Sequence, residues 1–342
     1  MSVQAETYVI INYKAARARA AWARAQSVLL ERGVRFDALE AKARKGDAQN
    51  AAREALRAGY KTIAVVGGDG TLGEVVTGFF EREDALAPLT PGAAAAAAAA
   101  TPPAPVNAGA ALALLPAGTG NDFARGLEGS RASLEHWLER LINHTRQRES
   151  ETTTTTRAVD VLHGISGDDA RPFFCLNAAT LGIGAEVAGR VAAQGRTVRR
   201  LSGEARFALA ALAAIARWRS RRVRVQVDGA AAFECATNLI AVVNSPFAGG
   251  GMMFSPDARI DDGLLDVVTA SRLTRASLVR EMTRIHSGGH VNNPRVRITR
   301  GARVRIEHLS PADALAVEAD GDVRGHTPLE FRVLAGALRV VV

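Results

Sequence analysis

Residues 62–73 read TIAVVGGDGTLG, and this stretch decides the fold of the chain. Its first half is an apolar run typical of a strand buried on both faces of a parallel sheet, and a glycine-rich turn and a helix start follow at once. Such a turn directs backbone N–H groups toward a phosphate. Residues 110–125, AALALLPAGTGNDFAR, repeat the arrangement. The turns carry Asp69 and Asp122, and carboxylates beside a phosphate require a metal cation, so the pair favours phosphoryl transfer.

Strands and helices alternate around this stretch. The hydrophobic pattern predicts strands at 8–12, 34–39, 62–66 and 110–115, and helices at 15–31, 47–58, 71–80 and 134–142. This order predicts a doubly wound parallel sheet that binds ligands at the carboxyl ends of its strands. Residues 85–109 hold an alanine run between prolines, and we interpret them as a surface insertion.

A charged, threonine-rich linker at 146–156 separates this region from a second one, which reads mainly as short strands with one helical region at 203–218. Short strands divided by turn signals predict an antiparallel sandwich. The expected fold is therefore an N-terminal Rossmann-like α/β domain followed by a mainly antiparallel β-sandwich. We expect the α/β nucleotide-binding domain at 1–150, with the tail 331–342 as a candidate addition, and the β-rich substrate domain at 157–330. Ligands commonly bind in the cleft between two such domains.

Composition bounds the possible partners and the location. The net charge of +8 is explained either by arginine-rich composition or by an anionic partner such as a membrane surface. The basic residues are dispersed and form no nucleic-acid motif, so we expect no nucleic acid. The N-terminus has no signal-peptide pattern, and the apolar run 207–216 is too short to span a bilayer. We expect a cytoplasmic protein that contacts the inner membrane face peripherally.

Residues 68–73 also match the dinucleotide fingerprint GxGxxG, which would indicate an NAD-dependent enzyme. Three observations oppose that interpretation. The motif follows the third expected strand and not the first, Asp69 lies inside it, and the acid that would bind the ribose would fall within the insertion, at about residues 90–95. No GxxxxGK[ST] phosphate loop is present either.

Residues 67–71 resemble the GGDGT motif shared by diacylglycerol kinases, sphingosine kinases, NAD kinases and phosphofructokinases. Residues 116–125 are similar to the PxGTxNDFAR motif of the diacylglycerol kinase catalytic-domain family, above all its bacterial lipid kinases. Four later segments resemble further motifs of this family and follow one another in the family's order: 158–161, 174–185, 255–266 and 318–322. The resemblance implies a first domain like that of phosphofructokinase and NAD kinase, ATP as phosphate donor, Mg²⁺, and a lipid hydroxyl as acceptor.

The resemblance places the nucleotide on residues of the loops that follow the first four strands: Asn12, Lys42, Gly67, Gly68, Asp69, Gly70, Thr71, Leu72, Gly73, Gly118, Thr119 and Asn121. Asn121 is interpreted either as a structural turn residue or as a ligand contact. The chain departs from the family pattern at 12–16, where NYKAA replaces NPxxG, and at Lys42, which replaces a threonine.

Two magnesium sites are expected. The chemistry of the turns and the resemblance both suggest that Asp69, Asp122 and Asp160 hold Mg²⁺, directly or through water. The alternatives are an Asx turn for Asp69, a helix-dipole contact for Asp122 and a plain strand position for Asp160. Residues 261–263 resemble a structural magnesium loop, in which the ligands are the Asp262 carboxylate and the carbonyls of Arg259 and Leu264; the alternative is a solvated hairpin turn.

The general base for the acceptor hydroxyl is expected at Asp320, with Asp322 as second candidate in the glutamate position of the family's DGE motif. The alternative for this segment is an ordinary Asp-Gly hairpin turn.

The sequence therefore predicts an ATP- and Mg²⁺-dependent lipid kinase. An NAD kinase-like enzyme and a catalytically silent nucleotide- or lipid-binding regulator are the rivals. The identity of the lipid and homodimer formation stay open.

Overall fold

The computed structural model describes residues 5–41, 44–81, 102–148, 155–166, 172–195, 198, 201 and 203–342. The chain divides into two compact units. The described residues of the first come from Met1–Glu83, Pro102–Val161 and Leu334–Val342, and those of the second from Leu162–Val333. Lys42 and residues 85–101 of the expected insertion lie outside the described residues.

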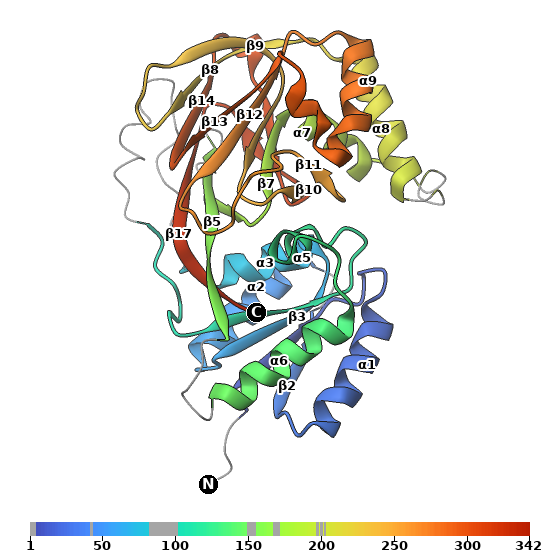
Figure 1. The fold of residues 1–342 in the computed structure, drawn as a ribbon, viewed down its shortest axis with the longest axis vertical. Coiled ribbons are helices and arrows are strands. Elements are labelled where there is room, and N and C mark those ends of the chain that lie inside the picture. The colour runs from blue at the N-terminus through green and yellow to red at the C-terminus, as the bar shows by residue number, and fades with distance from the viewer. Residues whose placement is uncertain are drawn as a thin grey trace. The chain divides into compact units, whose positions relative to one another are not determined.

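The first unit alternates strands and helices, as Figure 1 shows. Its elements are β1 (Thr7–Ile11), α1 (Ala18–Glu31), β2 (Phe36–Glu40), α2 (Asp47–Arg57), β3 (Thr62–Gly67), α3 (Asp69–Gly78), β4 (Ala111–Pro116), α5 (Asp122–Glu128) and α6 (Leu134–Arg148). The strands pair in parallel in the order β2-β1-β3-β4, and the end of β17 (Leu329–Val341) pairs in parallel with β4. This is the doubly wound arrangement that the sequence predicts.

Strand β3 lies in the middle of this sheet, and every one of its residues is buried. Its uninterrupted apolar sequence is what a strand covered on both faces requires. The register pairs Gly67 with Pro116, so β3 and β4 end side by side. Their glycine turns therefore emerge together at the carboxyl edge of the sheet.

The start of α3 differs from the expected helix at 71–80. The helix begins at Asp69, because the amide of Leu72 already donates a hydrogen bond to the carbonyl of Gly68. The first glycine turn is thus largely the first turn of the helix. At the described end of the insertion, the amide of Val106 donates to the carbonyl of Phe79, so this segment lies beside the residue that follows α3.

The second unit is built mainly of antiparallel strands. These are β6 (Pro172–Cys175), β7 (Ala178–Gly182), β8 (Arg221–Val227), β9 (Phe233–Val243), β10 (Phe247–Ala248), β11 (Met252–Met253), β12 (Leu265–Ser271), β13 (Val296–Gly301), β14 (Arg303–His308), β15 (Ala316–Ala319), β16 (Asp322–His326), the end of β5 (Thr156–Ser166) and the start of β17. The helices are α7 (Ile183–Ala192), α8 (Gly203–Arg217) and α9 (Arg275–Arg284), with 3₁₀ turns at Ile285–Ser287, Gly289–Asn292 and Pro311–Asp313.

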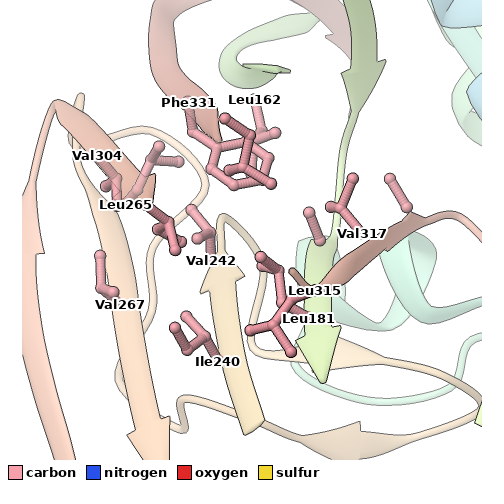
Figure 2. Close-up of a cluster of buried hydrophobic side chains, with 14 of the residues drawn as sticks. Leu162, Leu181, Ile240, Val242, Leu265, Val267, Val304, Leu315, Val317 and Phe331 are labelled. Atoms are coloured by element: carbon pink, nitrogen blue, oxygen red, sulfur yellow. The ribbon is translucent and has the colours of Figure 1, made fainter. Parts of the chain in front are cut away.

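Alternate residues of these strands meet in one apolar core. Figure 2 shows side chains from β7, β9, β12, β14 and β17 converging there, among them Leu181, Val242, Val267 and Phe331. All are fully or almost fully buried. The mainly antiparallel sandwich that the sequence predicts is confirmed.

Two helices of this unit are missing from the sequence prediction. Helix α7 contains two glycines and β-branched residues, so its intrinsic helix propensity is low. Helix α9 has a clear start signal, because the side chain of Thr274 accepts a hydrogen bond from the amide of Ser277. That N-cap was visible in the sequence and could have located the helix.

Candidate functional site

The two glycine turns of the first unit contact each other directly. The amide of Ala117 donates to the carbonyl of Gly67 over 2.7 Å. A Cβ atom added to Gly118 would lie 2.6 Å from the Cα of Gly68, which no real Cβ tolerates. Gly118 therefore requires glycine for close backbone approach and not merely for turn conformation, and Gly68 is tightly placed, since its added Cβ would lie 3.1 Å from the Cα of Gly118. The result is a bare backbone surface at the end of β3 and β4, suited to a phosphate.

Thr71 connects this surface to the first loop of the chain. Its hydroxyl accepts a hydrogen bond of 2.9 Å from the side-chain amide of Asn12. A Cβ on Gly67 would lie 2.8 Å from the Cβ of Thr71, so the turn wraps tightly around this threonine. Asn12 also accepts a hydrogen bond from the amide of Lys14. Asn12 thus orders its own loop and ties it to the first glycine turn, even though the proline and glycine of the NPxxG pattern are absent.

Asn121 closes the second turn upon itself. Its backbone is left-handed, with φ of 53°. Its side chain accepts from the amide of Gly118 over 2.9 Å and donates to the carbonyl of the same residue over 3.2 Å. The structure thus shows Asn121 as a turn residue; its predicted contact to the nucleotide stays a prediction.

Asp69 reaches from the first turn to the second. Its carboxylate accepts a hydrogen bond of 3.2 Å from the amide of Phe123, in the first turn of α5. Burial raises the pKa of Asp69, and hydrogen bonds from backbone amides at the start of α5 oppose this shift. A carboxylate held in this way would be stabilised by a nearby cation. Asp69 therefore has a structural role, and its environment also fits magnesium.

The other two candidate magnesium ligands are buried. Asp122 is 2% exposed at the start of α5, and Asp160 is 1% exposed on β5. Asp160 accepts a hydrogen bond of 2.7 Å from the amide of Gly336 in β17. Carboxylate oxygens are the ligands that Mg²⁺ prefers. Across the described ranges, however, no three His, Cys, Asp or Glu side chains are grouped closely enough to hold a metal ion. A shared magnesium site on Asp69, Asp122 and Asp160 stays a prediction.

A basic cavity of about 430 Å³ lies beside the second turn, between α1, α5 and α6. Its lining includes Arg17, Arg125 and Arg131 and contains no carboxylate. Arg17 and Arg131 donate hydrogen bonds of 3.3 Å to the carbonyls of Gly118 and Thr119, respectively. Their charges make this side of the turn favourable to anions.

In the second unit, Asp320 and Gly321 form the two-residue turn between β15 and β16. Both have left-handed backbones, with φ of 52° and 87°, so the turn is of the hairpin type that favours Asp-Gly. A second Asp-Gly turn, at Asp228 and Gly229 between β8 and β9, has the same property, with φ of 48° and 71°. Turn geometry alone thus explains the dipeptide, and a catalytic role for Asp320 needs its own test. Asp322 opens β16 and lies 3.6 Å from the Arg324 guanidinium.

Residues outside the predicted site hold this acidic turn. Glu318 accepts from the amide of Gly321 over 2.5 Å and from the hydroxyl of Thr180 over 2.7 Å. The thiol of Cys175 donates to the carboxylate of Asp320 over 3.2 Å. Burial and this carboxylate raise the pKa of the Cys175 thiol, which keeps it protonated and able to donate. The carbonyl of Ala178 also lies 3.3 Å from this sulfur, so the single thiol proton has two acceptors within reach.

The expected magnesium loop at 261–263 contains an ion pair. Asp262 accepts from the amide of Leu264 over 3.1 Å and lies 2.6 Å from the guanidinium of Arg300. Arg300 also contacts Asp266, over 2.6 Å. Arg259 lies 3.6 Å from Asp261. A guanidinium thus supplies positive charge at Asp262, and magnesium binding by Arg259, Asp262 and Leu264 stays a prediction.

The remaining predicted nucleotide contacts lie around the first unit's turns. Gly70 is exposed in the first turn of α3, whereas Leu72 and Gly73 are buried further along that helix. Thr119 is exposed in the second turn. Asn12, Gly67, Gly68, Thr71 and Gly118 form the connected set described above. None of the described helices is both long and apolar enough to cross a membrane.

Comparison with known proteins gives matches over both units. The family described as "Diacylglycerol kinase catalytic domain" matches residues 6–153, and "YegS C-terminal NAD kinase beta sandwich-like domain" matches residues 179–342. A "Diacylglycerol kinase" of Bacillus subtilis is 26% identical over 87% of this chain and 82% of its own length. A "Probable lipid kinase YegS-like" of Pseudomonas aeruginosa is 31% identical over 86% of this chain and 81% of its own length. A solved structure of a diacylglycerol kinase from Bacillus anthracis shares the fold, with a TM-score of 0.63, 19% identity, and coverage of 98% of this chain and 96% of that one.

Proposed function

Because this chain belongs to the diacylglycerol kinase family of lipid kinases, we propose that it transfers the terminal phosphate of ATP to the hydroxyl of diacylglycerol or a related lipid. The observation that carries the proposal is the contact between the two glycine turns, which leaves a bare backbone surface for phosphates. The basic cavity beside the second turn adds positive charge for an anionic donor.

The donor would lie with its phosphates along the two turns, beside Gly68 and the exposed residues Gly70 and Thr119, because the amide of Gly118 already donates to the side chain of Asn121. Backbone N–H groups would bind the phosphate oxygens, and Asn12 would keep Thr71 and the first loop in place. Asp69 and Asp122 would hold magnesium, with Asp160 as the third candidate, and the bound ion would neutralise charge on the transferring phosphate.

On the acceptor side, Asp320 would accept the proton of the lipid hydroxyl. The hydroxyl oxygen then forms a bond to the terminal phosphorus of ATP, the bond to the bridging oxygen breaks, and ADP leaves with that oxygen. The Cys175 thiol, which lies 3.2 Å from the Asp320 carboxylate, would help to orient it. Asp322 is the second candidate for the base. A lipid acceptor is presented at a membrane surface, so the proposal includes peripheral membrane contact.

The test is turnover of labelled ATP with magnesium, comparing diacylglycerol with NAD as acceptor. We expect label in a lipid product and none in NADP, and the reverse outcome would assign the chain to soluble NAD kinase chemistry. Binding of ATP without turnover on any acceptor would indicate a regulator.

The base is tested with Asp320→Asn, because asparagine also tolerates the left-handed turn. The control is Asp228→Asn, in the other Asp-Gly turn with positive φ at both residues; its carboxylate accepts from the amides of Ala302 and Arg303, so the stability of both variants is measured as well. We expect Asp320→Asn to stay folded and to lose roughly a hundredfold or more in turnover, within the range for a general base. Equal turnover in the two variants would exclude Asp320 and direct the test to Asp322.

A further inference from the structure

Helix α8 in the second unit is apolar on two faces. The inner face packs into a cluster with α7 and α9, where Ala211, Ala214 and Ile215 of α8 meet Val187 and Leu278. These α8 side chains are 3% exposed or less. This packing accounts for the helix as a structural element, and it leaves the opposite face unexplained.

The outer face of α8 is equally apolar and is exposed. Leu209 is 50% exposed and Leu212 is 54% exposed. The other exposed positions on this stripe are Ala205, Ala208 and Ala216. The intervals of three and four residues place all five on one side of the helix. A surface helix of a globular protein normally carries polar residues on this side, so the stripe indicates a partner that removes it from water.

Two further exposed apolar side chains belong to segments next to α8. Val279 of α9 is 40% exposed, and Leu201, just before α8, is 50% exposed. Among the described residues, half of the exposed large apolar side chains are Leu201, Leu209, Leu212 and Val279. Figure 1 shows α8 and α9 running alongside each other, and their shared apolar cluster confirms that they are in contact.

Exposed arginines border this apolar surface. Arg217 ends α8, Arg219 follows it, and Arg275 begins α9; all three are exposed. None of them forms an ion pair with any carboxylate in the described part of the chain, whereas Arg280 and Arg284 both contact Glu281. These three arginines therefore give the surface positive charge that no carboxylate of the described residues pairs with.

We propose that the exposed face of α8, together with Val279 and the bordering arginines, docks onto an anionic lipid bilayer. An apolar helical stripe with arginines at its border is the pattern of a helix that lies in the membrane interface, where the leucines enter the acyl boundary and the arginines meet anionic headgroups. A second copy of the chain is a poorer occupant, because it would bring three more arginines of the same kind to the interface, and none of these has a carboxylate partner among the described residues. The inference deepens the proposed function, since it names the surface that brings the enzyme to its lipid.

The test is sedimentation of the full-length protein with phosphatidylcholine vesicles, with and without phosphatidylglycerol, in the absence of ATP. The test variant is Leu209→Gln/Leu212→Gln. The control is Leu30→Gln, which alters a leucine of α1 that is 63% exposed. We expect binding to the anionic vesicles that weakens about tenfold or more in the double variant and stays unchanged in the control. Arg217→Gln/Arg219→Gln should weaken binding and flatten its salt dependence.

Three results would overturn the proposal: equal binding of the double variant and the wild type, equal binding to neutral and anionic vesicles, or a loss of self-association in the double variant without any loss of vesicle binding.

Phosphorylation of a lipid dissolved in detergent micelles separates this inference from the proposed function. If the docking proposal holds, the double variant keeps its micellar activity and loses activity on vesicles. If the proposed function fails, no lipid is phosphorylated in either form, while vesicle binding still tests the surface.

Discussion

The two glycine turns of the first unit are the place where a single added methyl group has the largest expected effect. In Gly118→Ala the new Cβ would lie 2.6 Å from the Cα of Gly68, so the turns must separate. Overpacking of this kind costs about 1–3 kcal/mol, and here the strain falls on the phosphate surface itself. We expect the KM for ATP to rise about tenfold or more, measured by steady-state kinetics with the lipid acceptor saturating.

Gly109→Ala is the matched control for this prediction. A Cβ at Gly109 meets only the side chain of Asn107, at an ordinary distance of 3.7 Å. Its KM for ATP should stay within about twofold of the wild type. If both variants bind ATP as the wild type does, the turns are not the donor site.

Asp69 gives a prediction for the pH dependence of stability. Burial raises its pKa above the ordinary value of 3.8 in the folded chain. The folded state therefore binds this proton more tightly than the unfolded state does. The stability gained from this protonation is fully present below pH 3.8, and it is lost as the pH rises through the raised pKa of the folded state. The difference in unfolding free energy between wild type and Asp69→Asn should thus shift in favour of the variant as the pH rises. Urea titrations from acid to neutral pH, without magnesium, measure this difference in unfolding free energy. A shift in favour of the wild type would contradict burial as the cause of the raised pKa.

At the scale of elements, Arg300 fastens the loop before β12 to β13. It lies 2.6 Å from both Asp262 and Asp266, and Asp266 is only 3% exposed. Arg300→Gln leaves this buried carboxylate without its cation, and we expect a loss of about 2 kcal/mol in unfolding free energy. Equilibrium unfolding in urea measures the loss.

The control for the Arg300 prediction is an exposed ion pair. Arg24 lies 3.7 Å from Glu135, and both side chains are 60% exposed. Arg24→Gln should change stability by less than about 0.5 kcal/mol, as exposed pairs generally do. Similar small losses in both variants would mean that the loop is held by other contacts.

The elements also show what the sequence could and could not predict. The apolar run before each glycine turn located β3 and β4, because a strand buried on both faces leaves an unmistakable pattern. Helix α7 was missed because its glycines and valines hide a helical pattern that only packing against β7 and α8 stabilises. The support of Asp320 by Cys175 joins residues far apart in the chain, and no local spacing signals such a contact.

At the scale of the whole molecule, the first unit contains one strand from the C-terminal end of the chain, the end of β17. Its residues Arg339 and Val340 pair with β4, and Val340 is fully buried. Val340→Asp places a charge in that core, and we expect a loss of at least about 3 kcal/mol. Arg339→Gln alters the exposed neighbour on the same strand and should be nearly neutral. Thermal unfolding of both variants checks the difference; similar melting temperatures would show that the tail is dispensable.

At this scale the sequence predicted the α/β unit, the β-sandwich and the family, because those depend on local patterns and ordered motifs. The site is less predictable. The role of Asn121 as a turn residue and the ion pair of Asp262 with Arg300 depend on side chains meeting in three dimensions. The same is true of the exposed stripe on α8: its apolar residues are evident in the sequence, but only the fold shows which of them face water.

The central claim is that this chain phosphorylates a lipid hydroxyl at the site formed by its glycine turns. The most direct measurement is incubation of the purified protein with ATP carrying a labelled terminal phosphate, magnesium and a total bacterial lipid extract, followed by mass identification of every labelled product. We predict one or a few labelled phospholipids with the wild type and a strong reduction with Gly118→Ala. Label confined to water-soluble products, or equal lipid labelling by the two proteins, would contradict the claim.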